Sequence, residues 1–480
     1  MDVDTITGPA LQSGADTIAG GLLEGETDLL DALGVRALLD RGEAKPEFRH
    51  LAVGHTGAAR VIVIGLGAAA DLDPERMRIA AALVRNRANE LGSSHLSWEL
   101  PAGAGTGAGG ELAAALVTGT ILGAYRFDRF KPSDAPAVPQ RLTIAGASDE
   151  HADAVRAAVI LADAQNRARD LGNSPPNLMT PSTLADYAVA LAARHDAMSA
   201  TVLDEAEIRF AGMGAFAAVA QGSDQPAKLI ALSYEPQAAA GGRRLALIGK
   251  AVTFDSGGLW LKPAASQITM KFDMAGGAAV IETVAALAQL DAPVRVLAVI
   301  GATENMINGS AMRPGDILTA LDGTTIEMNN SDAEGRLVLA DCITWAKREG
   351  CDAIVDIATL TGAAEVALGY VYAALLSNDD ELAALALRCG DRTGERLWRL
   401  PLDERYAEMV KGRYAQLTNR TEQRVAGAIT AAELLHHFAG DTPWAHLDIA
   451  GVGDNGRAPY LDKGGTGFGV RLLTELALSF

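Results

Sequence analysis

The residues best suited to chemistry lie in the octapeptide Asn330–Leu337, which reads Asn-Ser-Asp-Ala-Glu-Gly-Arg-Leu. Two carboxylates, Asp332 and Glu334, stand two residues apart, and the guanidinium of Arg336 is two residues further on. In an extended segment, side chains at i, i+2 and i+4 leave the same face, with roughly 7 Å between neighbours. We therefore expect an extended segment here, with one face that suits a divalent metal ion beside a small anion.

A second segment upstream adds two carboxylates and two lysines: Lys250, Asp255, Lys262 and Asp273. Oxygen ligands suit Mg²⁺, Mn²⁺ or Zn²⁺. Four carboxylates are enough to bridge two ions about 3.5–4 Å apart, the spacing of two-metal hydrolases. Acidic residues in loops are commonly solvated turn residues, but the flanking sequence here is apolar and rich in glycine. It favours one metal site built from both segments.

The cations near these carboxylates each allow two interpretations. Lys250 follows a predicted apolar strand. It could be a surface lysine, or a neutral amine ligand, because desolvation and nearby cations lower the pKa of a lysine. Lys262 and Arg336 could polarise a carbonyl group and stabilise a tetrahedral oxyanion, and they also balance the charge of the carboxylates.

Other catalytic motifs are absent or incomplete. Gly65–Ala70 matches G-x-G-x-x-A after a predicted strand, but an acidic loop follows it instead of a helix, which disfavours a dinucleotide site. The glycine-rich loop at 102–110 lacks the G-K-[ST] ending of a P-loop. The sequence has no H-E-x-x-H, no G-x-S-x-G and only 8 histidines, which disfavours a histidine-ligated zinc protease and a serine hydrolase.

Composition narrows the function classes further. The formal net charge of −19 disfavours nucleic-acid binding through a general basic surface. Three cysteines, Cys342, Cys351 and Cys389, form no disulfide framework, and we expect buried free thiols. The acidic N-terminus lacks a signal-peptide pattern, and charges such as Glu365 interrupt the apolar runs, so we expect a cytoplasmic protein without a membrane span.

A chain of 480 residues exceeds the length at which one core usually stops growing, so we expect two domains. Alternating strand and helix patterns predict an α/β fold in both. The predicted division is a smaller N-terminal α/β domain at 1–150, a connecting helix at 151–172, and a C-terminal domain at 173–480. The C-terminal domain is expected to have a central mixed sheet flanked by helices and to carry the metal site. Its predicted strands are Leu229–Tyr234, Arg244–Ile248, Arg295–Ile300, Ala353–Ala358 and His446–Ile449.

These motifs together resemble the leucyl (cytosol) aminopeptidase family, peptidase family M17. The octapeptide Asn330–Leu337 resembles the family signature, with Ser331 where threonine is commoner. Gly249–Pro263 and Met270–Met274 resemble its metal-binding segment, with Trp260 where a small residue is commoner. Shorter similarities extend over most of the chain, including 173–177, 356–363 and 444–451.

The resemblance implies a role for each candidate residue. Asp255 and Glu334 would bridge two Zn²⁺ or Mn²⁺ ions, Lys250 and Asp273 would complete the tighter site, and Asp332 would complete the more exchangeable one. Lys262 would polarise the scissile carbonyl, and Arg336 would hold a bicarbonate that acts as general base. The implied substrate-binding residues are Met270, Thr359, Leu360, Gly362 and Ala450.

The implied activity is removal of the N-terminal residue from peptides, with a leucine-like preference, by a homohexamer. Exopeptidase specificity follows because an internal peptide bond lacks the free amine that would coordinate an ion. Two alternatives remain: a hexameric DNA-binding or regulatory scaffold, which the charge disfavours, and a two-metal phosphoesterase using the same carboxylates.

Overall fold

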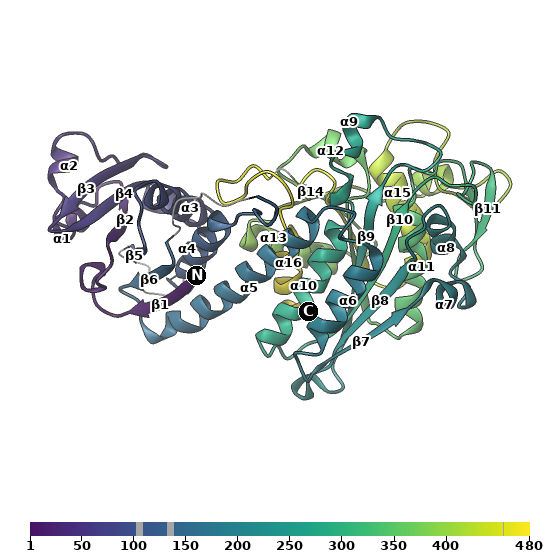
Figure 1. The fold of residues 1–480 in the computed structure, drawn as a ribbon, viewed down its shortest axis with the longest axis horizontal. Coiled ribbons are helices and arrows are strands. Elements are labelled where there is room, and N and C mark those ends of the chain that lie inside the picture. The colour runs from purple at the N-terminus through teal and green to yellow at the C-terminus, as the bar shows by residue number, and fades with distance from the viewer. Residues whose placement is uncertain (102–108, 132–138, 455) are drawn as a thin grey trace. The chain divides into compact units, whose positions relative to one another are not determined.

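The computed structural model describes residues 1–101, 109–131, 139–454 and 456–480 (Figure 1). The loop expected at 102–110 lies largely outside these residues. The chain divides into two compact units, one of residues 1–163 with 457–462 and one of 164–456 with 463–480. Both units are α/β, which confirms the predicted two-domain fold class. The division of the main chain falls within a long helix, α5 (Asp149–Asn173).

The N-terminal unit is built on a six-stranded sheet of order β1-β6-β5-β2-β4-β3. All neighbours are parallel except β3 and β4, which form an antiparallel pair. Alternate residues of β4 pack on opposite faces: Ile62 and Ile64 in one apolar cluster, Val61 and Val63 in another. Both faces are therefore covered, which explains the continuous apolar run. The strands are β1 (Asp2–Ile6), β2 (Thr17–Leu23), β3 (Leu51–Thr56), β4 (Ala59–Gly67), β5 (His95–Glu99) and β6 (Arg141–Ala145); the helices are α1 (Asp28–Ala32), α2 (Ala37–Asp40), α3 (Pro74–Glu90) and α4 (Gly109–Ala124).

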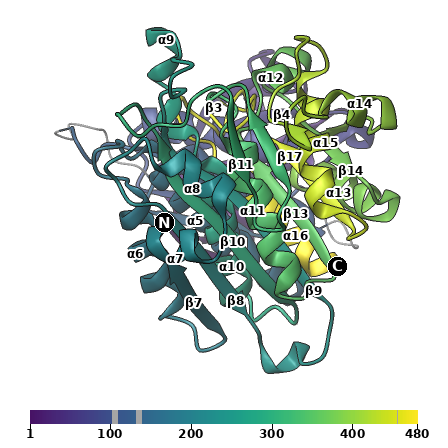
Figure 2. The same ribbon diagram turned by 90° about the vertical axis from the view of Figure 1, so that its right-hand side faces the viewer.

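The C-terminal unit has an eight-stranded mixed sheet of order β15-β14-β17-β13-β9-β10-β8-β7 (Figure 2). Its centre, β17-β13-β9-β10, is parallel, and antiparallel strands adjoin it on both sides. The chain passes from β9 to β10 on one side and later to β13 on the other, so the strand order reverses at β9 and β13. Ligand sites of open α/β sheets lie at such a point, beyond the carboxyl ends of the strands. The strands are β7 (Met198–Leu203), β8 (Lys228–Tyr234), β9 (Arg244–Asp255), β10 (Arg295–Asn305), β13 (Ala353–Ala358), β14 (Ala373–Ser377), β15 (Leu397–Arg399) and β17 (Trp444–Asp448).

Helices cover both faces of this sheet. In Figure 1, α6, α10 and α16 lie on one side of the strands, and α8, α11 and α15 lie on the other. A small sheet of β11 (Asp316–Thr319), β12 (Thr325–Met328) and β16 (Leu417–Thr418) completes the unit. The helices are α6 (Pro181–Ala192), α7 (Glu205–Phe210), α8 (Gly214–Ala220), α9 (Ala264–Gln267), α10 (Ala275–Gln289), α11 (Gly335–Arg348), α12 (Gly362–Leu368), α13 (Asp380–Thr393), α14 (Glu404–Met409), α15 (Gly427–Ala439) and α16 (Val470–Ser479).

Glycines let the first turn of α10 lie directly on the sheet. A Cβ atom at Gly276 would be 2.1 Å from the carbonyl oxygen of Ile357 in β13, and one at Gly249 would be 2.5 Å from the Cα of Gly277. Only residues without a side chain permit backbones to approach this closely. The segment just before α10, which contains Asp273, is thereby held against β9 and β13.

The predicted strands of the C-terminal unit are confirmed, but β9 and β10 extend several residues beyond their predicted ends, to Asp255 and Asn305. Cys342 and Cys389 are buried free thiols, as expected, and Cys351 is partly exposed. Among the described residues, no helix has the length and apolar character needed to cross a membrane.

The close approach of α10 to β13 leads us to a prediction about stability. Gly276→Ala should lower the free energy of unfolding by about 2–3 kcal/mol, because the backbone oxygen of Ile357 cannot rotate away from the added methyl group. Gly309→Ala, where a Cβ would meet nothing within 4 Å, is the control. Thermal unfolding followed by calorimetry measures both. Equal midpoints for the two variants would show that α10 can shift without cost.

Candidate metal centre

The strand β9 carries Lys250 and Asp255, and a β-bulge brings both to the same side of the sheet. In a regular strand, residues five apart leave opposite faces. The pairing of β9 with β10 shifts by one residue between Thr303 and Glu304, so β9 has one residue more than β10 at this point. Such a bulge reverses the alternation beyond it. Both side chains consequently reach the carboxylate of Glu334, with Lys250 Nζ at 2.8 Å.

The carboxylate of Asp255, at the end of β9, is held by both of its oxygens. Its Oδ1 accepts hydrogen bonds from Asn305 Nδ2 and from the backbone amide of Gly257, each at 2.8 Å. Its Oδ2 lies 2.8 Å from Lys262 Nζ. Gly257 adopts φ +87°, a conformation that favours glycine, and this sharp turn returns the chain toward Lys262.

Asp273 lies between a short 3₁₀ helix, η4 (Met270–Phe272), and α10. Its Oδ1 accepts a hydrogen bond from Thr359 Oγ1 at 2.8 Å and lies 2.7 Å from Lys250 Nζ. Its Oδ2 is buried and has no hydrogen-bond partner in the structure. Since an unpaired buried carboxylate oxygen is costly, this atom is suited to binding a cation.

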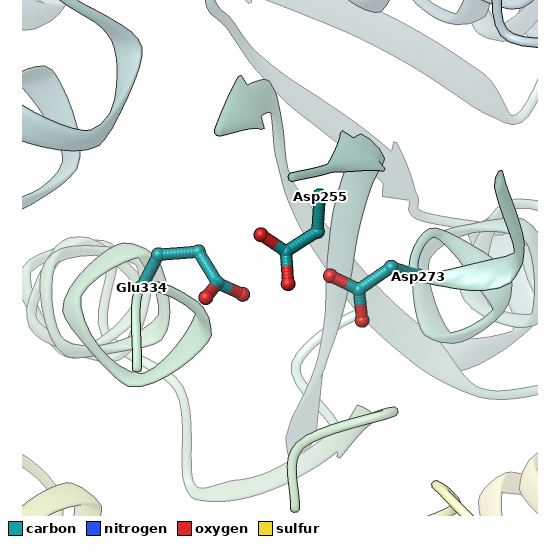
Figure 3. Close-up of side chains that lie close together, drawn as sticks. All are labelled: Asp255, Asp273 and Glu334. Carbon is teal, nitrogen blue, oxygen red and sulfur yellow. The ribbon is translucent and has the colours of Figure 1, made fainter. Parts of the chain in front are cut away.

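The octapeptide that contains Asp332 and Glu334 is not extended, so the predicted extended segment is wrong. Asn330 Oδ1 accepts a hydrogen bond from the amide of Asp332 at 2.9 Å, a local bond that starts a turn. Glu334 then has φ −75° and ψ −36°, and α11 begins at Gly335. The side chain of Glu334 therefore projects from the start of a helix toward Asp255 and Asp273 (Figure 3).

Gly335 is required by the position of Lys250. A Cβ atom at Gly335 would lie 2.7 Å from Lys250 Cε and 2.8 Å from its Nζ. The lysine side chain thus passes directly across the first turn of α11. The glycine of the signature octapeptide serves this packing rather than a positive φ.

Together these elements form a buried cluster of charges. One carboxylate oxygen from each of Asp255, Asp273 and Glu334 lies within 4.8 Å of the other two (Figure 3). Lys250 is only 2% exposed, which excludes the surface-lysine interpretation. Lys262 Nζ connects Asp255 to Asp332, at 2.8 and 2.5 Å.

The pKa values in the cluster reflect burial and mutual repulsion. Burial raises the pKa of Asp255 and of Asp273, and the nearby carboxylate of Glu334 raises both further. Burial and the charge of Asp255 raise the pKa of Asp332 to about 6. Burial alone would raise the pKa of Glu334, but Lys250 and Lys262 outweigh it and lower that pKa. The positive charge of the two ammonium groups is too small to neutralise all four carboxylates.

The residues present fit divalent cations. The donor set consists of carboxylate oxygens and one amine, which suits Mn²⁺ or Zn²⁺. Burial by itself would lower the pKa of Lys250, but the neighbouring carboxylates raise it by more. The net pKa is therefore raised, and the amine is protonated when no cation is bound. A cation bound by this amine would displace its proton, because an amine must be neutral to act as a metal ligand.

Arg336 lines a cavity of about 280 Å³ beside the cluster. Its Nη1 donates a hydrogen bond to the carbonyl oxygen of Asn419 at 2.9 Å, and its Nε is buried without a partner. Burial lowers the pKa of Arg336 to about 10, so the side chain stays cationic near neutral pH. A guanidinium with a free donor suits a small anion.

Of the five expected substrate-binding residues, two line this cavity and a third supports the charge cluster. Leu360 and Gly362 line the cavity together with Asp332 and Arg336. Thr359 instead supports the charge cluster, because its hydroxyl donates to Asp273 and its carbonyl accepts a hydrogen bond from Lys250 Nζ at 3.0 Å.

The other two expected substrate-binding residues, Met270 and Ala450, lie outside the set that lines this cavity. Met270 begins the 3₁₀ helix that precedes Asp273. The amide of Ala450 donates to Asp448 Oδ1, which also accepts from the amide of Leu360.

Sequence reasoning missed three residues that position the others. Asn305 joins Asp255 to the carbonyl oxygen of Ser331. Asn419 Oδ1 accepts a hydrogen bond from the amide of Asn330, and its Nδ2 donates to the carbonyl of the same residue. Asp448 holds the loop after β13 through Thr361 Oγ1 at 2.6 Å. The available signal was that Asn305 follows the predicted strand Arg295–Ile300 and that Asp448 lies near the end of the predicted strand His446–Ile449.

Comparisons with known proteins agree with this geometry. The family model for "Cytosol aminopeptidase family, catalytic domain" matches residues 166–474. The model for "Cytosol aminopeptidase family, N-terminal domain" matches residues 41–134. A probable cytosol aminopeptidase of Roseiflexus castenholzii is 44% identical, over 99% of this chain and 98% of that protein. One of Solibacter usitatus is 42% identical over 98% of each.

Two solved structures have the same fold. The bottromycin maturation enzyme BotP in complex with Mn is 35% identical, with a TM-score of 0.88 over 97% of this chain and 99% of that one. A mutant of tomato leucine aminopeptidase is 30% identical, with a TM-score of 0.92 over 100% of this chain and 97% of that one. By sequence along its full length and by fold, the chain belongs to the cytosol aminopeptidase family, peptidase family M17.

Proposed function

We propose that the chain is a two-metal aminopeptidase that removes the N-terminal residue, with a leucine-like preference, from peptides in the cytoplasm. The observation that carries this proposal is the buried cluster of Asp255, Asp273 and Glu334, which lacks enough positive charge of its own. Membership of the family supports it, and one structural relative, the bottromycin maturation enzyme BotP, is known in complex with Mn. Membership of the aminopeptidase family favours neither the scaffold nor the phosphoesterase. The homohexamer remains a prediction.

In this proposal the four carboxylates and Lys250 each have one role toward the ions. Asp255 and Glu334 would each hold both ions, Lys250 and Asp273 would complete the tighter site, and Asp332 would complete the exchangeable one. The buried, unpaired Oδ2 of Asp273 supports its place in the tighter site. Asp332 is the most exposed of the four carboxylates, with 27% of its side chain accessible, which suits an exchangeable site.

When bound, Mn²⁺ or Zn²⁺ supplies Lewis-acid polarisation and a water nucleophile near neutral pH. Lys262 would stabilise the oxyanion that develops on the scissile carbonyl, once cations have replaced it as the partner of Asp255 and Asp332. Arg336 would hold bicarbonate as general base, and its buried Nε without a partner supports an anion at that place. Leu360 and Gly362 would contact the peptide, since they line the adjoining cavity.

Removing a bridging carboxylate should abolish activity. Glu334→Ala and Asp255→Ala should each lower kcat/KM for leucyl p-nitroanilide by about 10³-fold or more, since neither ion then keeps its shared ligand. Glu349→Ala, at the exposed far end of the same helix as Glu334, is the control. Circular dichroism should show the native fold in all three. Full activity in either bridging variant would exclude the two-metal mechanism.

Substitution of Lys262 should lower the turnover rate but leave the metal content unchanged. Lys262→Met should lower kcat by about 10²-fold or more, the effect of losing an oxyanion-stabilising group, while elemental analysis still finds two ions per chain. Lys411→Met removes an exposed lysine and should change neither quantity. Parallel loss of metal and turnover in Lys262→Met would make the lysine structural.

Metal binding itself should stabilise the chain. Manganese at 100 times its Kd should add about 2.7 kcal/mol to the free energy of unfolding of chelator-treated protein, because it binds only the folded state. Asp273→Asn should lose most of this gain, whereas Asp224→Asn, on an exposed turn, should keep it. Thermal shift with and without Mn²⁺ measures the effect. An equal gain in both variants would place the ion elsewhere.

A further inference from the structure

The cavity beside the metal centre is strongly cationic. Arg336, Arg420 and Arg424 all line it, and among its described lining residues Asp332 alone carries a carboxylate. That carboxylate is already paired with Lys262. The local excess of positive charge contrasts with the formal net charge of −19 for the whole chain.

Neither Arg420 nor Arg424 forms an ion pair among the described residues. The guanidinium of Arg420 lies 4.8 Å from the ring centroid of Trp260, a cation–π contact that orients it without neutralising its charge. Trp260 is itself held by a hydrogen bond from its amide to Ser331 Oγ at 2.7 Å. Arg424 is exposed and free to follow a ligand. Two guanidinium groups at the cavity are therefore available to an anion.

The start of α15 adds an independent observation at the same cavity. Gly427 and Thr430 of its first turn line the cavity, and the N-cap, Ala426, offers no side-chain hydrogen bond. Ala426 also adopts φ +50°, a strained conformation for a residue with a side chain. The free amide groups and the dipole at a helix N-terminus favour negative charge.

We infer that this cavity binds a carboxylate on the second residue of the substrate, through Arg420, Arg424 and the N-terminus of α15. The inference rests on the proposed function, because it assumes that the scissile bond lies at the metal centre. The carboxylate has two possible sources: the free C-terminus of a dipeptide, or an acidic side chain at the second position. The substrate class is thus dipeptides or peptides with an acidic second residue.

The test compares substrates that differ only in this charge. Leucylglycine against leucylglycinamide tests the terminal carboxylate, and leucylaspartamide against leucylasparaginamide tests the side chain. In at least one pair, kcat/KM should be about tenfold higher for the charged substrate, mostly through KM, as expected for uniform binding of a remote group. The pair that shows the preference identifies the source.

The preference should depend on the two arginines. In Arg420→Gln/Arg424→Gln the ratio within that pair should fall to near one, while Arg405→Gln, an exposed arginine of α14, keeps the wild-type ratio. Ratios near one in wild type for both pairs, or a preference that survives the double substitution, would overturn the inference. If wild type with Mn²⁺ cleaves none of the four substrates, the proposed function fails instead.

Discussion

The central constraint on this molecule is the placement of four carboxylates, three of them buried, around two lysines. Each charge loses most of its hydration, and the ion pairs of Lys250 and Lys262 recover only part of that cost. The pKa values of Asp255 and Asp273 are raised as a result. Protons, the two lysines or bound cations can balance the remaining negative charge, and the neighbouring backbone holds the groups in place.

The fold supplies that support at the ends of four adjacent parallel strands. β9 ends in Asp255, β10 in Asn305 and β17 in Asp448, and Thr359 directly follows β13. Each of these residues either belongs to the charge cluster or hydrogen-bonds to a segment that does. Since the carboxyl ends of parallel strands meet at one edge of the sheet, groups distant in sequence converge there.

Close backbone packing around the cluster depends on small residues rather than on polar ones. Gly335 leaves room for Lys250 beside α11, and Gly276 lets α10 contact β13. These contacts fix the backbone beside the charge cluster. Asp332 of the cluster also lines the cavity of Arg336, Arg420 and Arg424, whose long cationic side chains extend the charged region.

The sequence by itself determined the fold class, most strands, and the family, because apolar periodicity and the octapeptide Asn330–Leu337 are local signals. It also singled out the residues of the cluster by charge and by flanking glycines. The sequence could not determine the directions in which these side chains point. The bulge in β9 depends on pairing with β10, and the start of α11 at Gly335 depends on a turn held by Asn419. Those partners are distant in the chain, so only the tertiary structure decided that Lys250, Asp255 and Glu334 face one another.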